Sequence, residues 1–252
     1  MRRGTRGPAP HANRLAMIGA ALVTALAPVA RALAQDAVPP AVASVRDLPL
    51  KEVRATVPGD VFAVFLTGDG GWTTLERGVT TPLIAAGVPV VGFSQLRYLL
   101  RKRSPDRVGA DLGRIIAAYR AKWHRNSVVV IGYSRGAGIV PFAVARLPAA
   151  QRDAVKAVVL IGAEHTAGFH LGLRDLVGSG PWKDELPVMP ELRQLGAATI
   201  VCFYGEAETD TLCPELAAPA ITVRMPGGHH FDGRYGDIGN RIVQVVQAAA
   251  KP

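Results

Sequence analysis

The stretch "VVVIGYSRGAGIVPF", Val128 to Phe142, is the strongest indication of the fold of this chain. It opens with a run of β-branched apolar residues, which predicts a buried strand. It ends in an apolar pattern typical of a helix. Ser134 lies between two glycines at the junction, in the pattern G-x-S-x-G. A strand, a sharp turn and a helix in this order raise a serine hydroxyl above the edge of a sheet, next to the positive end of the helix.

Apolar runs of the same kind recur along the chain and alternate with helical patterns. We predict strands at 61–68, 88–93, 127–132, 154–162, 198–205 and 220–225, and helices at 105–123, after the serine and at 237–250. Continuous apolar strands separated by helices indicate an α/β fold, with a mostly parallel sheet covered by helices on both faces. Together with the serine motif, this predicts an α/β-hydrolase fold in a single domain, 35–252. The segment 165–195 interrupts the alternation and is rich in Gly and Pro, so we predict an insertion that forms a cap over a site.

The N-terminus has the pattern of a secretory signal peptide. Several arginines precede an apolar, alanine-rich stretch, and small residues follow at the positions of a cleavage site. We predict cleavage after Ala34 and export to the periplasm. A membrane anchor is the alternative, although Pro28 interrupts an apolar stretch that is short for a membrane span.

Composition excludes some classes of protein. Hydrophobic residues make up 49% of the chain and charged residues 19%, which is a globular composition rather than a disordered one. The net charge of +9 is partly due to the five arginines of the first 34 residues. Because these leave with the signal peptide, the charge does not indicate a nucleic-acid partner, and no nucleic-acid motif is present.

Acidic and histidine candidates follow the serine in the order Ser, acid, His that is typical of α/β-hydrolases. The loop "GEAETDTLC" follows the fifth predicted strand, and "PGGHHFDG" follows the sixth. We predict a triad of Ser134, Asp210 and His229, in which the histidine accepts the serine proton and the acid holds the imidazole. Glu208 is the alternative acid and His230 the alternative base.

The loop "LTGDGGW" after the first predicted strand has glycines that let its backbone approach a ligand closely. We predict that the backbone N–H groups of Asp69 and Arg135 stabilise an oxyanion. A tight turn without a ligand is the alternative for this loop. No metal or other cofactor is expected. Adjacent histidines of a strand point apart, and no second pair of ligands has suitable spacing.

The chain has two cysteines, Cys202 and Cys213. Export permits a disulfide, and an even number of cysteines favours one. We predict that they are bonded to each other, which would close the loop that carries the acid and fix its position. Two buried thiols are the alternative.

Several of these stretches together resemble the VirJ/AcvB family of bacterial virulence proteins. The resemblance lies in "FLTGDGGW", "GVPVVGFSQLRYL", "VVVIGYSRGAGIVPFAVARLP", "CFYGEAETDTLCP" and "PGGHHFDGRY". It implies a periplasmic serine hydrolase on the α/β-hydrolase fold. It also implies hydrolysis of the aminoacyl ester of lysyl-phosphatidylglycerol at the membrane surface, or association with type IV secretion components.

The sequence offers groups that suit such a lipid. Two ammonium groups of the substrate call for carboxylates, and strand-end loops supply Asp69, Glu164, Glu206, Glu208 and Asp232. We also place His230 in the substrate-binding region. The stretch "RYLLRKRSPDR", 97–107, supplies basic residues with apolar neighbours for an anionic surface. A solvated surface is the alternative for this charge run.

Two other functions remain open from the sequence. The chain could be a binding protein that uses a hydrolase scaffold in a secretion complex, because a fold does not determine a function. It could also be a general carboxylesterase or thioesterase for soluble substrates. A complete triad argues against the first alternative, since a binding protein does not need one.

Overall fold

The structure is a computed structural model, and it describes residues 44–172 and 185–249. The predicted signal peptide, 1–34, lies outside the described residues, as does the middle of the predicted cap segment. No helix in the described part of the chain is long and apolar enough to cross a membrane.

The sheet has seven strands in the order β1-β3-β2-β4-β5-β8-β9. All neighbouring strands are parallel except β1, which is antiparallel to β3. The strands are β1 (Leu50–Val53), β2 (Val61–Leu66), β3 (Val90–Phe93), β4 (Ser127–Tyr133), β5 (Val155–Ile161), β8 (Thr199–Gly205) and β9 (Ile221–Met225). The predicted mostly parallel sheet is therefore present. The antiparallel edge strand β1 was not predicted, because its four residues contain two charged side chains.

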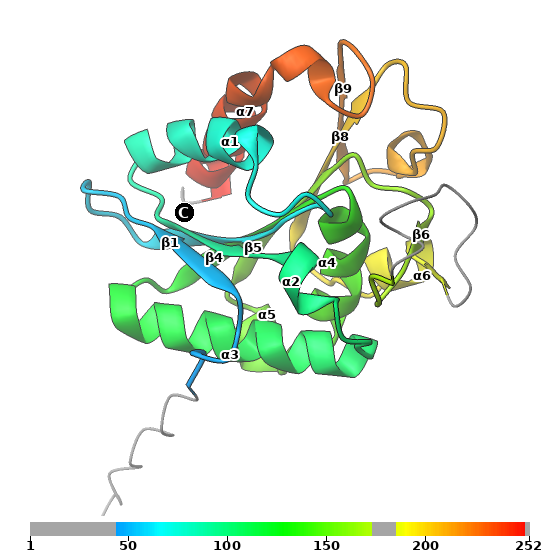
Figure 1. Cartoon of the computed structure of the whole chain (residues 1–252). Helices are drawn as coiled ribbons and strands as arrows, with labels where there is room; N and C mark the ends of the chain where they lie inside the picture. The colour runs from blue at the N-terminus through cyan, green and yellow to red at the C-terminus, as the bar shows by residue number, and fades with distance from the viewer. Residues whose placement is uncertain (1–43, 173–184, 250–252) are drawn as a thin grey trace, which may run out of the picture. The chain divides into compact units, whose positions relative to one another are not determined.

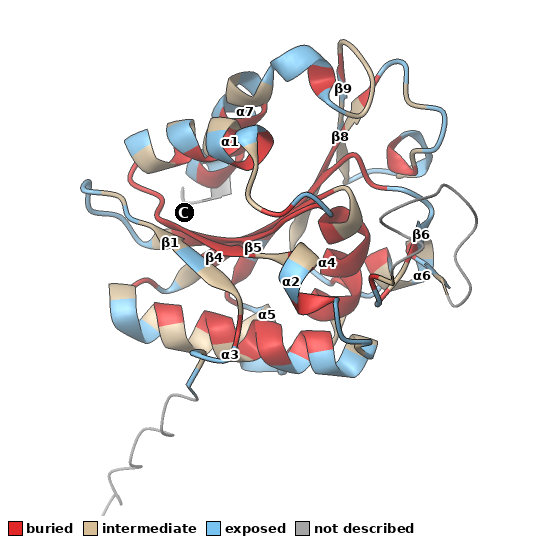
Figure 2. Ribbon diagram, in the orientation of Figure 1, coloured by how far each residue is buried: buried red, intermediate tan, exposed pale blue. Residues whose placement is uncertain are grey.

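Helices cover both faces of the sheet (Figure 1). The helices α1 (Thr74–Ala85) and α7 (Tyr235–Ala249) pack side by side on one face, and the long α3 (Pro105–Trp123) lies on the other with α4 (Arg135–Ala145) and the short α5 (Ala149–Arg152). Each long helix turns its buried side to the sheet and its exposed side to solvent (Figure 2). The two apolar cores lie between these layers. The arrangement confirms the predicted α/β class with two covered faces.

Smaller elements complete the described chain. They are α2 (Gln95–Tyr98), the two-stranded sheet of β6 (Thr166–Ala167) and β7 (Leu186–Pro187), α6 (Met189–Leu192), and the 3-10 turns η2 (Cys213–Glu215) and η3 (Phe231–Gly233). β6, β7 and α6 all lie in the segment predicted as a cap.

The strand order places one edge of the sheet at a topological switch point. After β2 the chain moves outward to β3, then returns to the other side of β2 to form β4 and β5. The register pairs Leu66 with Gly132, and Tyr133 with Ile161. The loops that follow β2, β4 and β5 therefore start at one level, at the edge where α/β proteins bind their ligands.

Candidate active site

Ser134 occupies a sharp turn between β4 and α4. Its backbone has φ 52° and ψ −120°, a conformation that residues other than glycine rarely adopt. A Cβ atom added at Gly132 would collide with the backbone of Gly136, and one added at Gly136 would collide with the carbonyl of Leu66. The two glycines of the motif are thus needed because three backbone segments meet around the serine.

His229 lies against the serine. Its Nε2 is 2.8 Å from Ser134 Oγ, and the ring of Tyr133 stacks on the imidazole with ring centroids 5.3 Å apart. The backbone of Gly162 packs against the other part of the ring, where an added Cβ would lie 2.9 Å from His229 Nδ1. The structure therefore places His229, rather than His230, next to the hydroxyl.

Glu208 holds the other nitrogen of the same ring. Its Oε1 lies 2.6 Å from His229 Nδ1, and its Oε2 accepts a hydrogen bond from the backbone N–H of Gly205. The carboxylate is almost completely buried, with 5% of the side chain exposed. This hydrogen bond raises the pKa of His229, although burial of the ring acts in the opposite direction.

The prediction that Asp210 is this acid is wrong. Asp210 lies two residues further along the loop and is exposed, and it pairs with Nδ1 of His165 rather than with His229. His165 also contacts Glu215, at 2.7 Å from Nε2 to the carboxylate. Because the loop turns outward after Glu208, Glu208 and not Asp210 points toward the imidazole beside the serine. The alternative acid, Glu208, takes the place predicted for Asp210.

The loop after β2 lies directly beside the serine. A Cβ added at Gly68 would be 3.5 Å from Ser134 Cβ. Glu76, which is completely buried, accepts hydrogen bonds from the backbone N–H of Thr73 at 2.7 Å and of Gly68 at 3.4 Å. This carboxylate fixes the loop that contains Asp69. The pattern T-x-x-E of a helix capping box could have identified Glu76 from the sequence.

Asp69 and Arg135, both predicted through their backbones, also interact through their side chains. The guanidinium of Arg135 binds both carboxylate oxygens of Asp69, with 3.0 Å between Nη2 and Oδ2. Only 8% of the Arg135 side chain is exposed. No local sequence pattern indicates this pair, because the two residues are far apart along the chain.

A small cavity opens beside the serine. It has a volume of about 110 Å³, and its lining includes Ser134, Asp69, Arg135, Glu164 and Glu185. Three carboxylates and one guanidinium thus surround it, so its walls carry an excess of negative charge. Partial burial and the neighbouring Asp210 and Glu185 carboxylates raise the pKa of Glu164. Glu185, which also accepts a hydrogen bond from Thr166, was not identified from the sequence.

The other residues predicted to bind substrate lie elsewhere. Glu206 is exposed and forms an ion pair with Arg224 at 3.4 Å, and Glu208 is occupied by His229. His230 is exposed, and its Nδ1 lies 3.0 Å from the hydroxyl of Tyr133. None of these three residues lines the cavity beside Ser134. Of the carboxylates predicted to bind the substrate, Asp69 and Glu164 line this cavity.

The predicted disulfide between Cys202 and Cys213 is present. Both cysteines are completely buried, one in β8 and the other at the start of η2. The bond closes the loop that contains both Glu208 and Asp210. Its short closed loop limits how far Glu208 can move from the end of the strand. Disulfides of this kind are typical of exported proteins.

In a comparison with protein families, the family described as "Bacterial virulence protein (VirJ)" matches residues 60–250, which include Ser134, His229, Glu208 and Asp210. A comparison with curated proteins found no match.

Solved structures of similar fold include several hydrolases. The esterase domain of a Rhodothermus marinus protein has a TM-score of 0.56 at 14% identity and covers 79% of this chain and 98% of its own. The serine hydrolase XC6422 of Xanthomonas campestris, described as lacking a lid, has a TM-score of 0.51 at 16% identity and covers 81% and 90%. A thioesterase domain from the curacin biosynthetic pathway has a TM-score of 0.55 at 12% identity and covers 81% and 97%. These likenesses identify the fold as that of an α/β-hydrolase.

Proposed function

This chain belongs to the VirJ family of bacterial virulence proteins, and we propose that it is a serine hydrolase that cleaves ester bonds. The observation that carries this proposal is the unbroken chain of hydrogen bonds from Glu208 through His229 to Ser134. A serine hydroxyl becomes a nucleophile when an oriented imidazole accepts its proton. The buried carboxylate orients that imidazole and stabilises its protonated form.

Each residue has a defined task in this reaction. Ser134 Oγ attacks the carbonyl carbon of the ester, and its proton passes to His229 Nε2, 2.8 Å away. The protonated imidazole then donates this proton to the leaving alcohol, and an acyl-serine remains. Water enters, gives its proton to the same nitrogen and attacks the acyl carbon, which releases the acid and restores Ser134.

Negative charge develops on the carbonyl oxygen of the ester during the attack, and hydrogen-bond donors must stabilise it. We assign this task to the backbone N–H of Arg135, at the N-terminus of α4, and to that of Asp69 in the neighbouring loop. The hydrogen bonds from Thr73 and Gly68 to Glu76 support this assignment, because they hold the loop at a constant distance from the serine. A donor fixed in advance requires no reorganisation during the reaction.

The substrate that we propose is the aminoacyl ester of lysyl-phosphatidylglycerol. A lysyl group carries two ammonium groups, and the cavity next to Ser134 is lined by the carboxylates of Asp69, Glu164 and Glu185. Carboxylates around a small cavity favour cations over neutral groups. An excess of negative charge beside the nucleophile therefore supports a cationic acyl group.

We place this activity in the periplasm. The disulfide supports export, because such bonds persist in oxidising compartments. Residues 1–34 would then be the signal that directs the chain there. Association with type IV secretion components is a second proposal, which rests on the family alone.

The experiment is hydrolysis by the purified protein without residues 1–34, tested on lysyl-phosphatidylglycerol, a neutral acyl-phosphatidylglycerol and a small soluble ester. We expect the Ser134→Ala variant to lose at least about a thousandfold in kcat on every substrate. Ser127→Ala is the matched control, because Ser127 lies at the opposite end of β4 and its hydroxyl contacts Asp60. Full activity of Ser134→Ala would refute the proposal.

The same panel separates the alternatives. A preference for the lysyl lipid over the neutral lipid supports the proposed substrate, whereas equal rates on soluble esters favour a general carboxylesterase or thioesterase. A binding function on a hydrolase scaffold predicts a different outcome. In that case Ser134→Ala would restore every phenotype of a deletion strain.

A further inference from the structure

A groove of about 580 Å³ lies away from the serine, between the chain that leads into β1 and the segment around α2. We name it the arginine groove; its charged lining consists of Arg46, Asp47, Arg97, Arg101 and Arg103. The single carboxylate among them is paired with Arg114, whose hydrogen bond lowers the pKa of Asp47. The lining of the groove therefore has four guanidinium groups and one carboxylate, which already has a cationic partner.

In the part of the chain that the structure describes, most of these cations have no acidic partner. Within 44–172 and 185–249, no ion pair is formed by Arg46, Arg97 or Arg101, and all three are exposed. The guanidinium of Arg103 lies over the ring of Tyr98, 4.4 Å from its centroid, and its Nε donates to the Tyr98 carbonyl at 3.2 Å. One planar guanidinium can donate hydrogen bonds to two oxygens of a phosphate, so this set of arginines suits phosphate groups.

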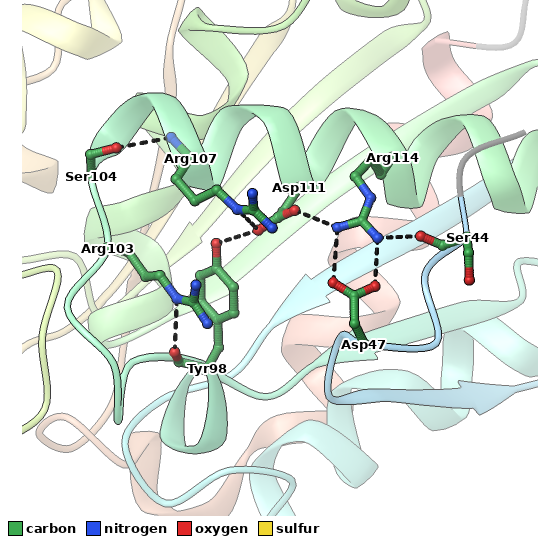
Figure 3. Close-up of polar contacts among 8 residues, drawn as sticks. All are labelled: Ser44, Asp47, Tyr98, Arg103, Ser104, Arg107, Asp111 and Arg114. Carbon is green, nitrogen blue, oxygen red and sulfur yellow. Dashed lines mark hydrogen bonds and ion pairs between the residues drawn. The ribbon is translucent and has the colours of Figure 1, made fainter.

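Polar contacts to side chains of α3 hold residues of the groove in place (Figure 3). Asp111 of α3 is completely buried and accepts hydrogen bonds from the hydroxyl of Tyr98, from Arg107 and from Arg114, each at 2.8 Å. Arg114 also binds Asp47 and the carbonyl of Ser44 on the opposite wall. One buried carboxylate thus connects both walls to the same helix. A preformed groove loses little conformational entropy when it binds a ligand.

Leu100 adds an apolar group between the arginines. Its side chain is 58% exposed, and among the described residues it belongs to a group of three large exposed apolar side chains, with Val57 and Leu186. An exposed leucine between cationic side chains gives no advantage in binding a soluble phosphate. It does suit the boundary between phosphates and acyl chains in a bilayer.

The arginine groove and the cavity beside Ser134 are linked through the backbone. The N–H of Leu171 donates to the carbonyl of Leu99 at 2.8 Å, and the N–H of Arg103 donates to that of Phe169 at 2.9 Å. The segment that pairs with 99–103 follows Gly168, which lines the cavity. The wall of the groove and the wall of the cavity therefore belong to connected segments of the chain.

We propose that the arginine groove, with Leu100 at its edge, docks the protein on the surface of an anionic phospholipid bilayer. Lipid phosphates occupy the groove and contact the guanidinium groups, and Leu100 enters the acyl boundary. The inference goes beyond the proposed hydrolysis and does not depend on it, because docking requires no reaction at Ser134.

The test is flotation of the protein, without residues 1–34, with vesicles of phosphatidylcholine alone or mixed with phosphatidylglycerol. Neither lipid carries an aminoacyl ester, so the result is independent of the proposed hydrolysis. We expect binding to the mixed vesicles, weakened by salt. The double variant Arg97→Gln/Arg101→Gln should reduce this binding by about tenfold or more. Leu100→Ser should reduce it less, by a few-fold.

The matched control is Arg77→Gln/Arg241→Gln, which removes the same charge from exposed positions on α1 and α7, across the sheet from α3. The thermal unfolding midpoint of each variant shows whether it is folded. Equal loss in the control and in the groove variant would overturn the proposal, as would absence of binding by the unaltered protein. Glycerol phosphate provides the third arm. Tight binding of this soluble phosphate, without preference for the mixed vesicles, would also overturn it.

Discussion

Two carboxylate–imidazole pairs lie in neighbouring parts of this molecule, and they differ mainly in burial. In one pair, Glu208 is 5% exposed and holds His229, which is 33% exposed and contacts Ser134. In the other, Asp210 is 66% exposed and holds His165, which is 45% exposed. Both acids come from one loop, two residues apart. The acid of such a site is therefore selected by where the loop turns away from the sheet, and not by the type of acid.

Replacing each acid by its amide should separate the two pairs most clearly. We expect Glu208→Gln to lower kcat by about 100- to 10,000-fold, because the imidazole loses the group that orients it and stabilises its charge. Asp210→Asn should change kcat by less than about twofold, since its partner is solvated and does not touch the serine. Ester hydrolysis by the purified variants measures both. A larger loss in Asp210→Asn than in Glu208→Gln would reverse the assignment of the acid.

The pH dependence of kcat/KM should also distinguish the two pairs. His229 must be neutral to accept a proton, and its hydrogen bond to Glu208 raises its pKa. Activity should therefore rise with pH through a value above the ordinary histidine pKa of about 6.5. In the residual activity of Glu208→Gln this midpoint should move to lower pH. A matched change at the other pair, His165→Gln, should leave the midpoint in place; a shift of equal size would contradict the separation of the two pairs.

The exposed pair should affect stability only slightly. Hydrogen bonds to Asp210 and then to Glu215 raise the pKa of His165, so the folded state holds its proton more tightly than the unfolded state. The resulting stabilisation is present below about pH 6.5 and is lost as the pH rises through the raised folded-state value. Because the pair is solvated, we expect His165→Gln to lower the unfolding midpoint at pH 6 by about 2 °C or less. Scanning calorimetry at pH 6 and pH 9 tests this; a larger loss at the higher pH would contradict it.

The sequence was informative where one local pattern determines the structure. Helix α3 has the predicted bounds, Pro105–Trp123, because Ser104 caps it, Pro105 starts it and apolar residues follow at helical spacing. The turn at Ser134 was predicted for a similar reason, since only glycines fit around it. The strands of the parallel sheet also appear near their predicted positions, because they are continuous apolar runs.

The sequence was less informative where distant segments meet. Glu208 lies before the loop turns outward and Asp210 lies after it, and no local sequence pattern predicts the position of this turn. Arg135 and Asp69 form a pair although they are 66 residues apart in the sequence. Glu185 approaches the cavity because β6 pairs with β7. The strand β1 escaped prediction because it is short and half-polar, and its pairing with β3 determines it more than its composition does.

The backbone at Ser134 has a consequence for how this protein can be improved. With φ at 52°, Ser134 has a backbone conformation that glycine would adopt with less strain. This strain is present in the folded chain and is released when the turn unfolds. A substitution that relieves this strain would make the molecule more stable and remove the proposed nucleophile at the same time. Selection for heat resistance and selection for turnover therefore act in opposite directions at this one position, and a more robust version of the protein has to gain its stability elsewhere.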